Sequence, residues 1–239
     1  MFDIEWAERL GVRVSDEDRG YAERISVLGG IDCKYNTICL AKRAIEEEIP
    51  GDFVECGAHG GGHPALMAYV ENRYGKGSRK VHLFDSWEGQ PQAGIFDEEN
   101  YQKQLGVNPD PKVGIPSGIF VATIEQCREN MRNWGVKADF LVYHQGWLQE
   151  VLPIITPFFP SIALLRVDVD LHDSTVPVYE HLYDKISLSG YIVSDDWGAG
   201  EGYDACRKAV YDFHDRREIP RPEVTRLPDT RGTVWWRKP

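Results

Sequence analysis

Ser161-Ile-Ala-Leu-Leu-Arg-Val-Asp-Val-Asp-Leu-His-Asp-Ser-Thr175 is an apolar run that ends in three carboxylates and a histidine. Its Ile, Leu and Val residues do not alternate with polar ones, which indicates a strand covered on both faces, as parallel strands in α/β proteins are. Ligands of such sheets gather at the carboxyl ends of the strands. The stretch therefore predicts an α/β fold in which a buried strand delivers acids to one edge of a sheet.

A second apolar run, Gly190-Tyr-Ile-Val-Ser-Asp-Asp-Trp-Gly198, repeats this design further along the chain. Two neighbouring strand ends would place several carboxylates around one point. Converging carboxylates repel one another and raise one another's pKa unless a cation neutralises them. Because Mg²⁺ prefers oxygen ligands and keeps open positions for a substrate, we expect Asp168, Asp195 and Asp196 to hold a magnesium ion.

Asp170 lies two residues after Asp168, so in continued strand geometry it points to the same face. That position is near the metal without ligating it, which suits a general base acting on a hydroxyl. Acids that follow a strand can instead cap the next helix. We assign that role to Asp173 or Ser174, before a helix expected over Thr175–Ile186.

The rest of the chain alternates strands and helices. Strands are expected over Asp52–Cys56, Lys80–Asp85, Asp139–Tyr143, Ile162–Asp168 and Tyr191–Ser194, with a terminal hairpin of Glu223–Leu227 and Thr233–Arg237. This order predicts a doubly wound, mostly parallel sheet with a C-terminal antiparallel hairpin. Residues 1–49 are expected to form an N-terminal helical extension and residues 50–239 one domain, with a lid loop at about 90–118 where periodicity is lost.

Composition excludes several classes of partner. The net charge of −11 over 239 residues argues against nucleic-acid binding as the main task. No apolar run is long enough to span a bilayer, and the first residues show no secretory signal. Five scattered cysteines without C-x-x-C pairs fit buried free thiols in a reducing cytoplasm better than disulfides or a zinc site.

The turn after the first strand, Gly57-Ala-His-Gly-Gly-Gly62, can bring main-chain N–H groups close to a ligand. It lacks the G-x-G-x-x-G spacing of dinucleotide folds. Glu55-Cys-Gly57 resembles the usual opening of S-adenosylmethionine-binding turns in class I methyltransferases, although a turn without a ligand fits the same pattern. Asp85, at the end of the second strand, is placed to accept hydrogen bonds from both ribose hydroxyls, the alternative being a solvated loop acid.

Aromatic and histidine side chains near these strand ends are less specific. Three tryptophans follow strand ends on the same rim, where their rings could wall a ligand pocket: Trp87, Trp147 and Trp197. His59, His63 and His172 are each explained better by packing or hydrogen bonding than by catalysis. His144 would border an adenine in such a fold.

From about Pro50 onward the chain resembles the macrocin O-methyltransferase family, S-adenosylmethionine- and magnesium-dependent enzymes that methylate sugar hydroxyls of macrolide and aminocoumarin antibiotics. The blocks that carry the resemblance stand in family order. They are Pro50-Gly-Asp-Phe-Val-Glu-Cys-Gly57 with Gly61-Gly62, Phe84-Asp-Ser-Trp-Glu-Gly89, Gly146-Trp147 with Leu152-Pro153, Leu164-Leu-Arg166 with Asp168-x-Asp-Leu171, Ser174-Thr175, Asp195-Asp196, Cys206-Arg-Lys-Ala-Val210 and Val234-Trp-Trp-Arg-Lys238.

The resemblance implies a class I methyltransferase-like fold, the same three aspartates as magnesium ligands, and Asp170 as the base. The residues expected at the cofactor are Glu55, Gly57, His59, Asp85, Ser86, His144 and Asp168. The chain departs from the family where His59 and Gly60 replace a tryptophan and an arginine, where His63 replaces a small residue, and where His172 replaces a tyrosine. Because these changes alter the rim of the site, the acceptor could differ from a macrolide sugar.

We therefore expect a magnesium-dependent O-methyltransferase that moves the methyl group of S-adenosylmethionine to a small-molecule hydroxyl, in the first place a sugar hydroxyl of a glycosylated natural product. A catechol-type O-methyltransferase is the nearest alternative. A metal-dependent hydrolase and a non-catalytic binding module are more distant ones. We also expect a homo-oligomer, a dimer or larger, with neither a nucleic acid nor a membrane as partner.

Overall fold

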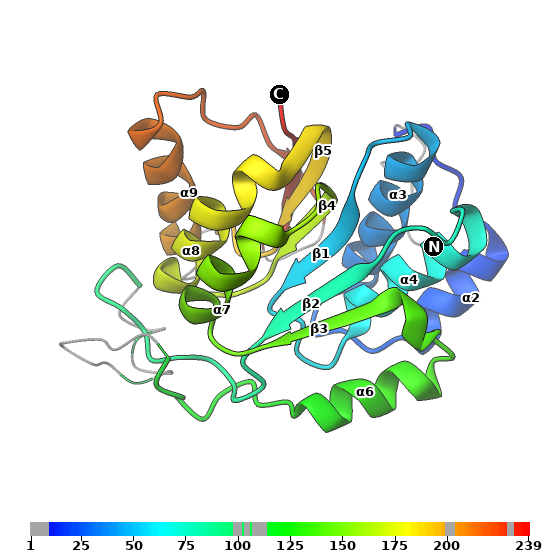
Figure 1. The fold of residues 1–239 in the computed structure, drawn as a ribbon, viewed down its shortest axis with the longest axis horizontal. Helices are drawn as coiled ribbons and strands as arrows, with labels where there is room; N and C mark the ends of the chain where they lie inside the picture. The colour runs from blue at the N-terminus through cyan, green and yellow to red at the C-terminus, as the bar shows by residue number, and fades with distance from the viewer. Residues whose placement is uncertain (1–9, 98–101, 103–105, 107–113, 199–203, 229–231) are drawn as a thin grey trace.

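The computed structural model describes residues 10–97, 102, 106, 114–198, 204–228 and 232–239 (Figure 1). Within them a seven-stranded sheet has the order β3-β2-β1-β4-β5-β7-β6. The strands are β1 (Asp52–Cys56), β2 (Val81–Asp85), β3 (Leu141–Gln145), β4 (Ile162–Val167), β5 (Ile186–Ser194), β6 (Thr225–Arg226) and β7 (Val234–Arg237). The first five pair in parallel and the last two are antiparallel, which confirms the predicted sheet and its terminal hairpin.

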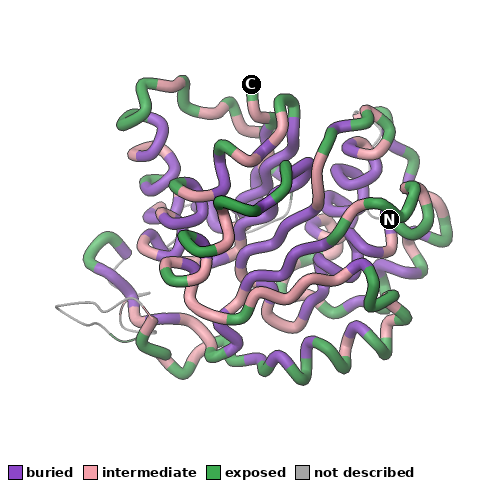
Figure 2. Tube along the Cα trace, viewed as in Figure 1, coloured by how far each residue is buried: buried purple, intermediate pink, exposed green. Residues whose placement is uncertain are grey.

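Helices cover both faces of this sheet (Figure 1). They are α2 (Asp16–Arg24), α3 (Ile31–Glu46), α4 (Gly62–Tyr74), α6 (Ile124–Asn133), α7 (Leu148–Ile155), α8 (His172–Leu182) and α9 (Asp204–Arg216), with short 3-10 helices η1 (Ala138–Phe140), η2 (Thr156–Phe158) and η3 (Tyr183–Lys185). The first four pack into one apolar core and the last three into the other. Figure 2 shows the central strands buried between these two layers.

Every residue of Ile162–Val167 in β4 is buried, as its unbroken apolar pattern predicts. β1 lies beside it, and between these two strands the order of the sheet reverses direction along the chain. In doubly wound sheets the crevice at this switch point is where ligands bind. A ligand site is therefore expected at the carboxyl ends of β1 and β4.

The helices before β1 are packed into the body of the molecule. Asp18 on α2 is fully buried and accepts hydrogen bonds from Lys42 Nζ at 3.1 Å and from the Tyr74 hydroxyl at 2.8 Å. A buried acid needs such partners to offset its desolvation. The predicted helical character of this region is confirmed for α2 and α3, whereas the domain boundary at residue 49 stays a prediction.

Several local predictions differ from the structure, among them the strand expected over Asp139–Tyr143, which runs from Leu141 to Gln145. α7 was not expected, because Pro153 within it and the prolines that follow were interpreted as breaks in an apolar run. β5 begins at Ile186 rather than Tyr191. α8 begins at His172 with Leu171 as its N-cap, so the capping role predicted for Asp173 or Ser174 is wrong.

Part of the loop predicted as a lid, about 90–118, lies outside the described residues. Its two described ends run side by side, joined by an isolated bridge between Pro91 and Pro116. The Ser117 N–H also donates to the Gln90 carbonyl at 2.7 Å. The function of this loop as a lid stays a prediction.

All five cysteines are buried and free, as predicted. Among the described helices, none has the length and apolar composition needed to cross a membrane. The cytoplasmic location and the homo-oligomeric state stay predictions. Light scattering after size-exclusion chromatography would measure the second.

Candidate active site

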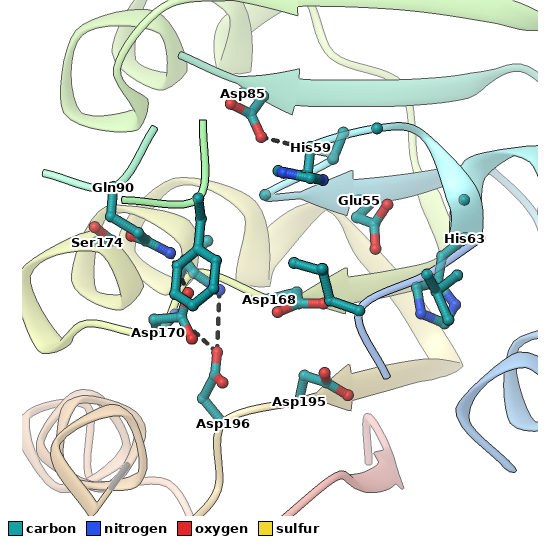
Figure 3. Close-up of a pocket in the computed structure, with 18 of the residues that line it drawn as sticks. Glu55, His59, His63, Asp85, Gln90, Asp168, Asp170, Ser174, Asp195 and Asp196 are labelled. Carbon is teal, nitrogen blue, oxygen red and sulfur yellow. Dashed lines mark hydrogen bonds between the residues drawn. The ribbon is translucent and has the colours of Figure 1, made fainter. Parts of the chain in front are cut away.

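A cavity of about 680 Å³ opens at the carboxyl ends of the parallel strands (Figure 3). Its walls come from the turns after β1 to β5 and from the loop between α2 and α3. We call one part the turn end, which contains Gly57, His59, His63, Asp85 and Trp147. The other part, the loop end, contains Gln90, Phe120, Asp170 and Ser174.

At the turn end, the main chain after β1 passes very close to the chain after β4. Gly57 has a φ of +86°, and a Cβ atom there would lie 1.7 Å from the Asp168 carbonyl oxygen. Only glycine fits both the backbone conformation and the space. The acidic-x-Gly pattern thus has a steric cause, since the turn joins the ends of β1 and β4.

Asp85 fastens the next turns together. One carboxylate oxygen accepts from the His59 N–H and the other from the Trp87 N–H, both at 2.7 Å. Burial raises the pKa of Asp85, and the two main-chain donors oppose that rise. An ionised carboxylate accepts about four hydrogen bonds, so Asp85 keeps acceptor capacity facing the cavity.

His63 presents a defined tautomer to the turn end. The Thr37 hydroxyl donates its single proton to the Cys33 carbonyl at 3.1 Å. The 2.8 Å contact between Thr37 and His63 Nδ1 therefore requires Nδ1 to carry the proton and to donate. Burial, and then the charge of Arg166, lowers the pKa of His63 well below its usual range, so the ring is neutral and its Nε2 is an acceptor.

Arg166 on β4 is buried beneath the acids and holds three of them. Its Nε donates to Glu55 at 3.0 Å, and its Nη2 lies 3.2 Å from Asp168 and 2.7 Å from Asp195. A buried guanidinium needs such partners. Burial raises the pKa of Glu55, an effect that this ion pair opposes.

Asp196 holds the loop that carries Asp170. One of its carboxylate oxygens accepts from the Val169 N–H at 3.1 Å and from the Asp170 N–H at 2.8 Å (Figure 3). Burial raises the pKa of Asp196 well above its usual range, and the charges of Asp170 and Asp168 raise it further. The pKa of Asp168 rises through desolvation and then through Asp195.

Asp168, Asp195 and Asp196 have the ligand chemistry and the location that a hard divalent cation requires. Their carboxylates come from two neighbouring strand ends, line one cavity and carry an excess of negative charge. Their present orientation is different. Over the part of the chain that the structure describes, no three His, Cys, Asp or Glu side chains are arranged to hold a metal ion. Asp168 and Asp195 face Arg166, so they would have to turn from it to share a cation.

At the loop end, Gln90 comes from the segment after β2 and donates from Nε2 to Asp170 Oδ2. Phe120 and Asp170 both have positive φ, +51° and +59°. Non-glycine residues adopt this conformation at a cost, and such residues are enriched at functional sites. Gln90 and Ser174 lie on the side of Asp170 away from His63 (Figure 3).

Most of the residues predicted for the site line the cavity: Glu55, Gly57, His59, Asp85, Ser86, Asp168, Asp170, Asp195 and Asp196. His144 is not among them. Its ring stacks on Phe84 and is bonded to His82 Nδ1 at 2.9 Å, on the face covered by α7. The placement of this side chain thus gives no support to its predicted role at an adenine.

Other aromatic expectations divide in the same way. Trp147 lines the cavity, whereas Trp87 is buried and donates to the His59 carbonyl, and Trp197 packs against Trp236 in the core. His172 does not line the cavity either; the Phe96 ring covers it at 4.4 Å between centroids.

Sequence reasoning missed several residues of the cavity wall. Arg166 lies beneath the acids and outside the wall, and its role was also missed, although a charge within an apolar strand requires buried partners of opposite charge. The loop Ser26–Gly30 also lines the cavity, although its Gly29-Gly30 pair was the only hint of a close approach. Gln90 and Phe120 carried no signal that separates them from ordinary loop residues.

Comparison with known proteins gives the site a context. Residues 35–238 match the family model described as macrocin O-methyltransferase (TylF). A tetracenomycin-C rhamnosyl 4'-O-methyltransferase from Streptomyces olivaceus is 30% identical over 194 residues, 81% of this chain and 68% of that protein. Demethyldecarbamoylnovobiocin O-methyltransferase from Streptomyces niveus is 28% identical over 226 residues, 94% of this chain and 80% of that protein.

A solved structure shows the same relationship in three dimensions. The O-methyltransferase NovP superposes with a TM-score of 0.73 at 26% sequence identity, covering 87% of this chain and 80% of NovP. The likeness therefore extends over most of the chain.

Proposed function

This chain belongs to the macrocin O-methyltransferase family, and from that premise we propose that it methylates a sugar hydroxyl of a glycosylated natural product with the help of Mg²⁺. Its activity as an S-adenosylmethionine-dependent O-methyltransferase follows from the family and the fold. The observation that carries the finer proposal is the two-ended cavity, with an acid suited to a ribose at one end and an acid suited to proton removal at the other.

The turn end is proposed to bind the cofactor. The Asp85 carboxylate has acceptor capacity left for ribose hydroxyls. The turn after β3 is held beside it, because the Gly146 N–H donates to the Asp85 main-chain carbonyl, and Trp147 in this turn can stack on a base. Neutral His63 offers an acceptor for an ammonium group. When bound, S-adenosylmethionine supplies a methyl group that an oxygen nucleophile attacks.

At the loop end, Asp170 is proposed to take the proton of the acceptor hydroxyl. General-base catalysis of this kind contributes about 10²–10⁴-fold. Asp196 holds the main chain of Asp170 in place, and Gln90 orients its carboxylate. The protein thus contributes position and proton removal.

The three aspartates Asp168, Asp195 and Asp196 are proposed to hold Mg²⁺. Their number and the excess of negative charge over Arg166 support this assignment. When bound, the ion supplies positive charge that lowers the pKa of a nearby hydroxyl. EDTA should abolish turnover and magnesium should restore it, while calorimetry with S-adenosylhomocysteine should show cofactor affinity nearly unchanged; full turnover in EDTA would remove the metal from the proposal.

The acceptor is proposed from the relatives and the cavity together. The name of the Streptomyces olivaceus relative specifies a rhamnosyl group on an aromatic aglycone. Exposed apolar side chains come from the described ends of the 90–118 loop and from just beyond it, and Phe120 among them lines the cavity: Ile95, Phe96, Ile115, Phe120 and Val121. They suit an apolar aglycone that stays at the rim while its sugar enters.

The test is a panel of acceptors with isotopically labelled S-adenosylmethionine. Each glycoside is paired with its aglycone, and catechols form a third group. We expect methyl transfer to glycosides and at least about tenfold less transfer to the aglycones. The aglycone lacks the sugar and therefore loses one or two hydrogen bonds to the site, each of which contributes about 1 kcal/mol. Equal transfer to aglycones would contradict the sugar assignment.

The catechol alternative is favoured by one observation, the Phe120 ring in the cavity wall, because an aromatic acceptor would stack on it. Transfer to catechols alone in the same panel would select it. Membership of an O-methyltransferase family decides against the hydrolase and the binding module.

A further inference from the structure

We propose that the segment Gln90–Asp97 positions the base by holding its carboxylate and the residues that follow it, Asp170–Asp173. The inference rests on the proposed role of Asp170. We call the first segment the brace. It joins β2 to the loop that carries the base, two elements far apart in the chain.

The two ends of the brace make polar contacts. At its start, Gln90 Nε2 donates to Asp170 Oδ2. At its finish, Asp97 Oδ1 accepts from the His172 N–H at 3.2 Å, and Asp97 Oδ2 accepts from the Gly94 N–H at 2.7 Å. Asp97 is 4% exposed, so these bonds replace its hydration.

Asp97 supplies α8 with an N-terminal side-chain acceptor, which the N-cap residue of the helix does not provide. The N-cap residue Leu171 has no side chain that can accept from the first turn. The first N–H groups of a helix need partners from outside it, and a carboxylate there also interacts favourably with the helix dipole. Asp97 therefore fixes the start of α8, two residues after Asp170.

The middle of the brace is held by packing. Ala93 and Leu171 are 0% and 1% exposed and share a small apolar cluster with Ile119. Gly94 lies so close to the helix that a Cβ atom there would stand 2.6 Å from Asp173 Oδ2. The contacts thus run along most of both segments.

The base needs this support because of its backbone. Asp170 has a φ of +59°, a conformation that a side-chain-bearing residue keeps only when its surroundings impose it. Asp196 holds its N–H from the β5 side. The brace holds its carboxylate and the residues that follow from the opposite side.

His172 acquires a role from this arrangement. Its N–H is the donor to Asp97, its Nδ1 lies 2.8 Å from Asp173 Oδ1, and the Phe96 ring covers it. His172, one of the residues that depart from the family pattern, thus belongs to the segment that the brace holds, outside the cavity wall.

The first test uses Gln90→Ala and Asp97→Asn. Each should lower kcat by about tenfold or more, since small misplacements of a catalytic group cost up to about 10²-fold, while the affinity for S-adenosylhomocysteine stays within about twofold. The matched controls are Gln92→Ala and Glu88→Gln, neighbours that form none of these contacts, and they should keep kcat. A fall in cofactor affinity equal to the fall in kcat would show general damage and overturn the proposal.

The second test repeats both changes in an Asp170→Asn background. If the brace acts through the base, neither change lowers the residual rate by more than about twofold, because coupled changes are not additive. A further tenfold fall would overturn the brace and leave the base intact. Full activity of Asp170→Asn alone would instead remove the base, and the brace with it; if Asp97→Asn fails to fold, Gln90→Ala decides.

Discussion

At the turn end of the cavity the main chain holds the functional groups, whereas at the loop end side chains from separate segments hold one another. Gly57 and the His59 and Trp87 N–H groups, which donate to the Asp85 carboxylate, fix the turn end through local turns at strand ends. Gln90, Asp97 and Asp196 fix the loop end across long sequence separations. Substitutions at the turn end should therefore lower stability and cofactor affinity, and substitutions at the loop end should lower the turnover rate.

The largest effect is expected for Gly57→Ala. A left-handed backbone costs a residue with a side chain about 1–2 kcal/mol. The clash with the Asp168 carbonyl adds about 1–3 kcal/mol. Urea unfolding should show the loss, and S-adenosylhomocysteine binding should fall with it.

Gly77→Ala is the matched control for that change. Gly77 has a φ of +72° with nothing within 4 Å of the added Cβ. It shares the backbone cost and lacks the clash. Equal destabilisation by the two variants would show that the contact between the ends of β1 and β4 does not matter.

Asp85→Asn should weaken S-adenosylhomocysteine binding by about 10–100-fold, because hydrogen bonds to a charged group contribute about 1.5–3 kcal/mol. Its amide nitrogen would also face one of the two N–H donors now bonded to the carboxylate. Isothermal titration calorimetry measures the affinity, and Glu88→Gln is the control in the same loop. An unchanged affinity would separate the turn end from the cofactor.

Phe120→Ala should raise the KM for the acceptor by about threefold to tenfold, from the lost burial of about 1–2 kcal/mol of apolar side chain. Cofactor affinity should stay the same, since Phe120 lies at the loop end. Phe158→Ala, which removes the ring of an exposed phenylalanine outside the cavity lining, is the control. A change in cofactor affinity alone would show that the two ends are not separate.

The smallest effect is expected in the dependence of stability on pH. The pKa of His63 is lowered in the folded protein by burial, so between that pKa and the unfolded value of about 6.5 the unfolded chain binds more protons. Stability should therefore rise with pH up to about 6.5 and be lost as pH falls below it. His63→Gln should flatten this part of the curve, and His181→Gln should not; identical curves for His63→Gln and the parent protein would contradict the buried neutral ring.

Much of the fold could be predicted because periodicity and strand ends are local. The unbroken apolar run of β4 and the Glu55-Cys-Gly57 turn depend on residues adjacent in the chain, so the sequence predicted five parallel strands, and most of the residues that it proposed for the site line the cavity. α7 was missed because Pro153 lowers helix propensity locally, while burial of Leu148 and Leu152 in the core stabilises the helix. Tertiary packing outweighed the local signal.

His144 and His172 show the limit of position as evidence. Both stand near strand ends, yet one ring faces the α7 side of the sheet and the other is covered by Phe96. The direction of a side chain depends on register and on neighbours from distant segments. The sequence could place these residues near the edge and could not say which way they point.

The sequence by itself determined the doubly wound sheet, the acids at its edge and the glycine turn, since each depends on residues adjacent in the chain. Only the tertiary structure decided that Arg166 faces three acids, that Asp97 caps a helix 75 residues away and that Gln90 meets Asp170. These contacts join segments whose meeting depends on how the layers pack. Local propensity carries no information about such meetings.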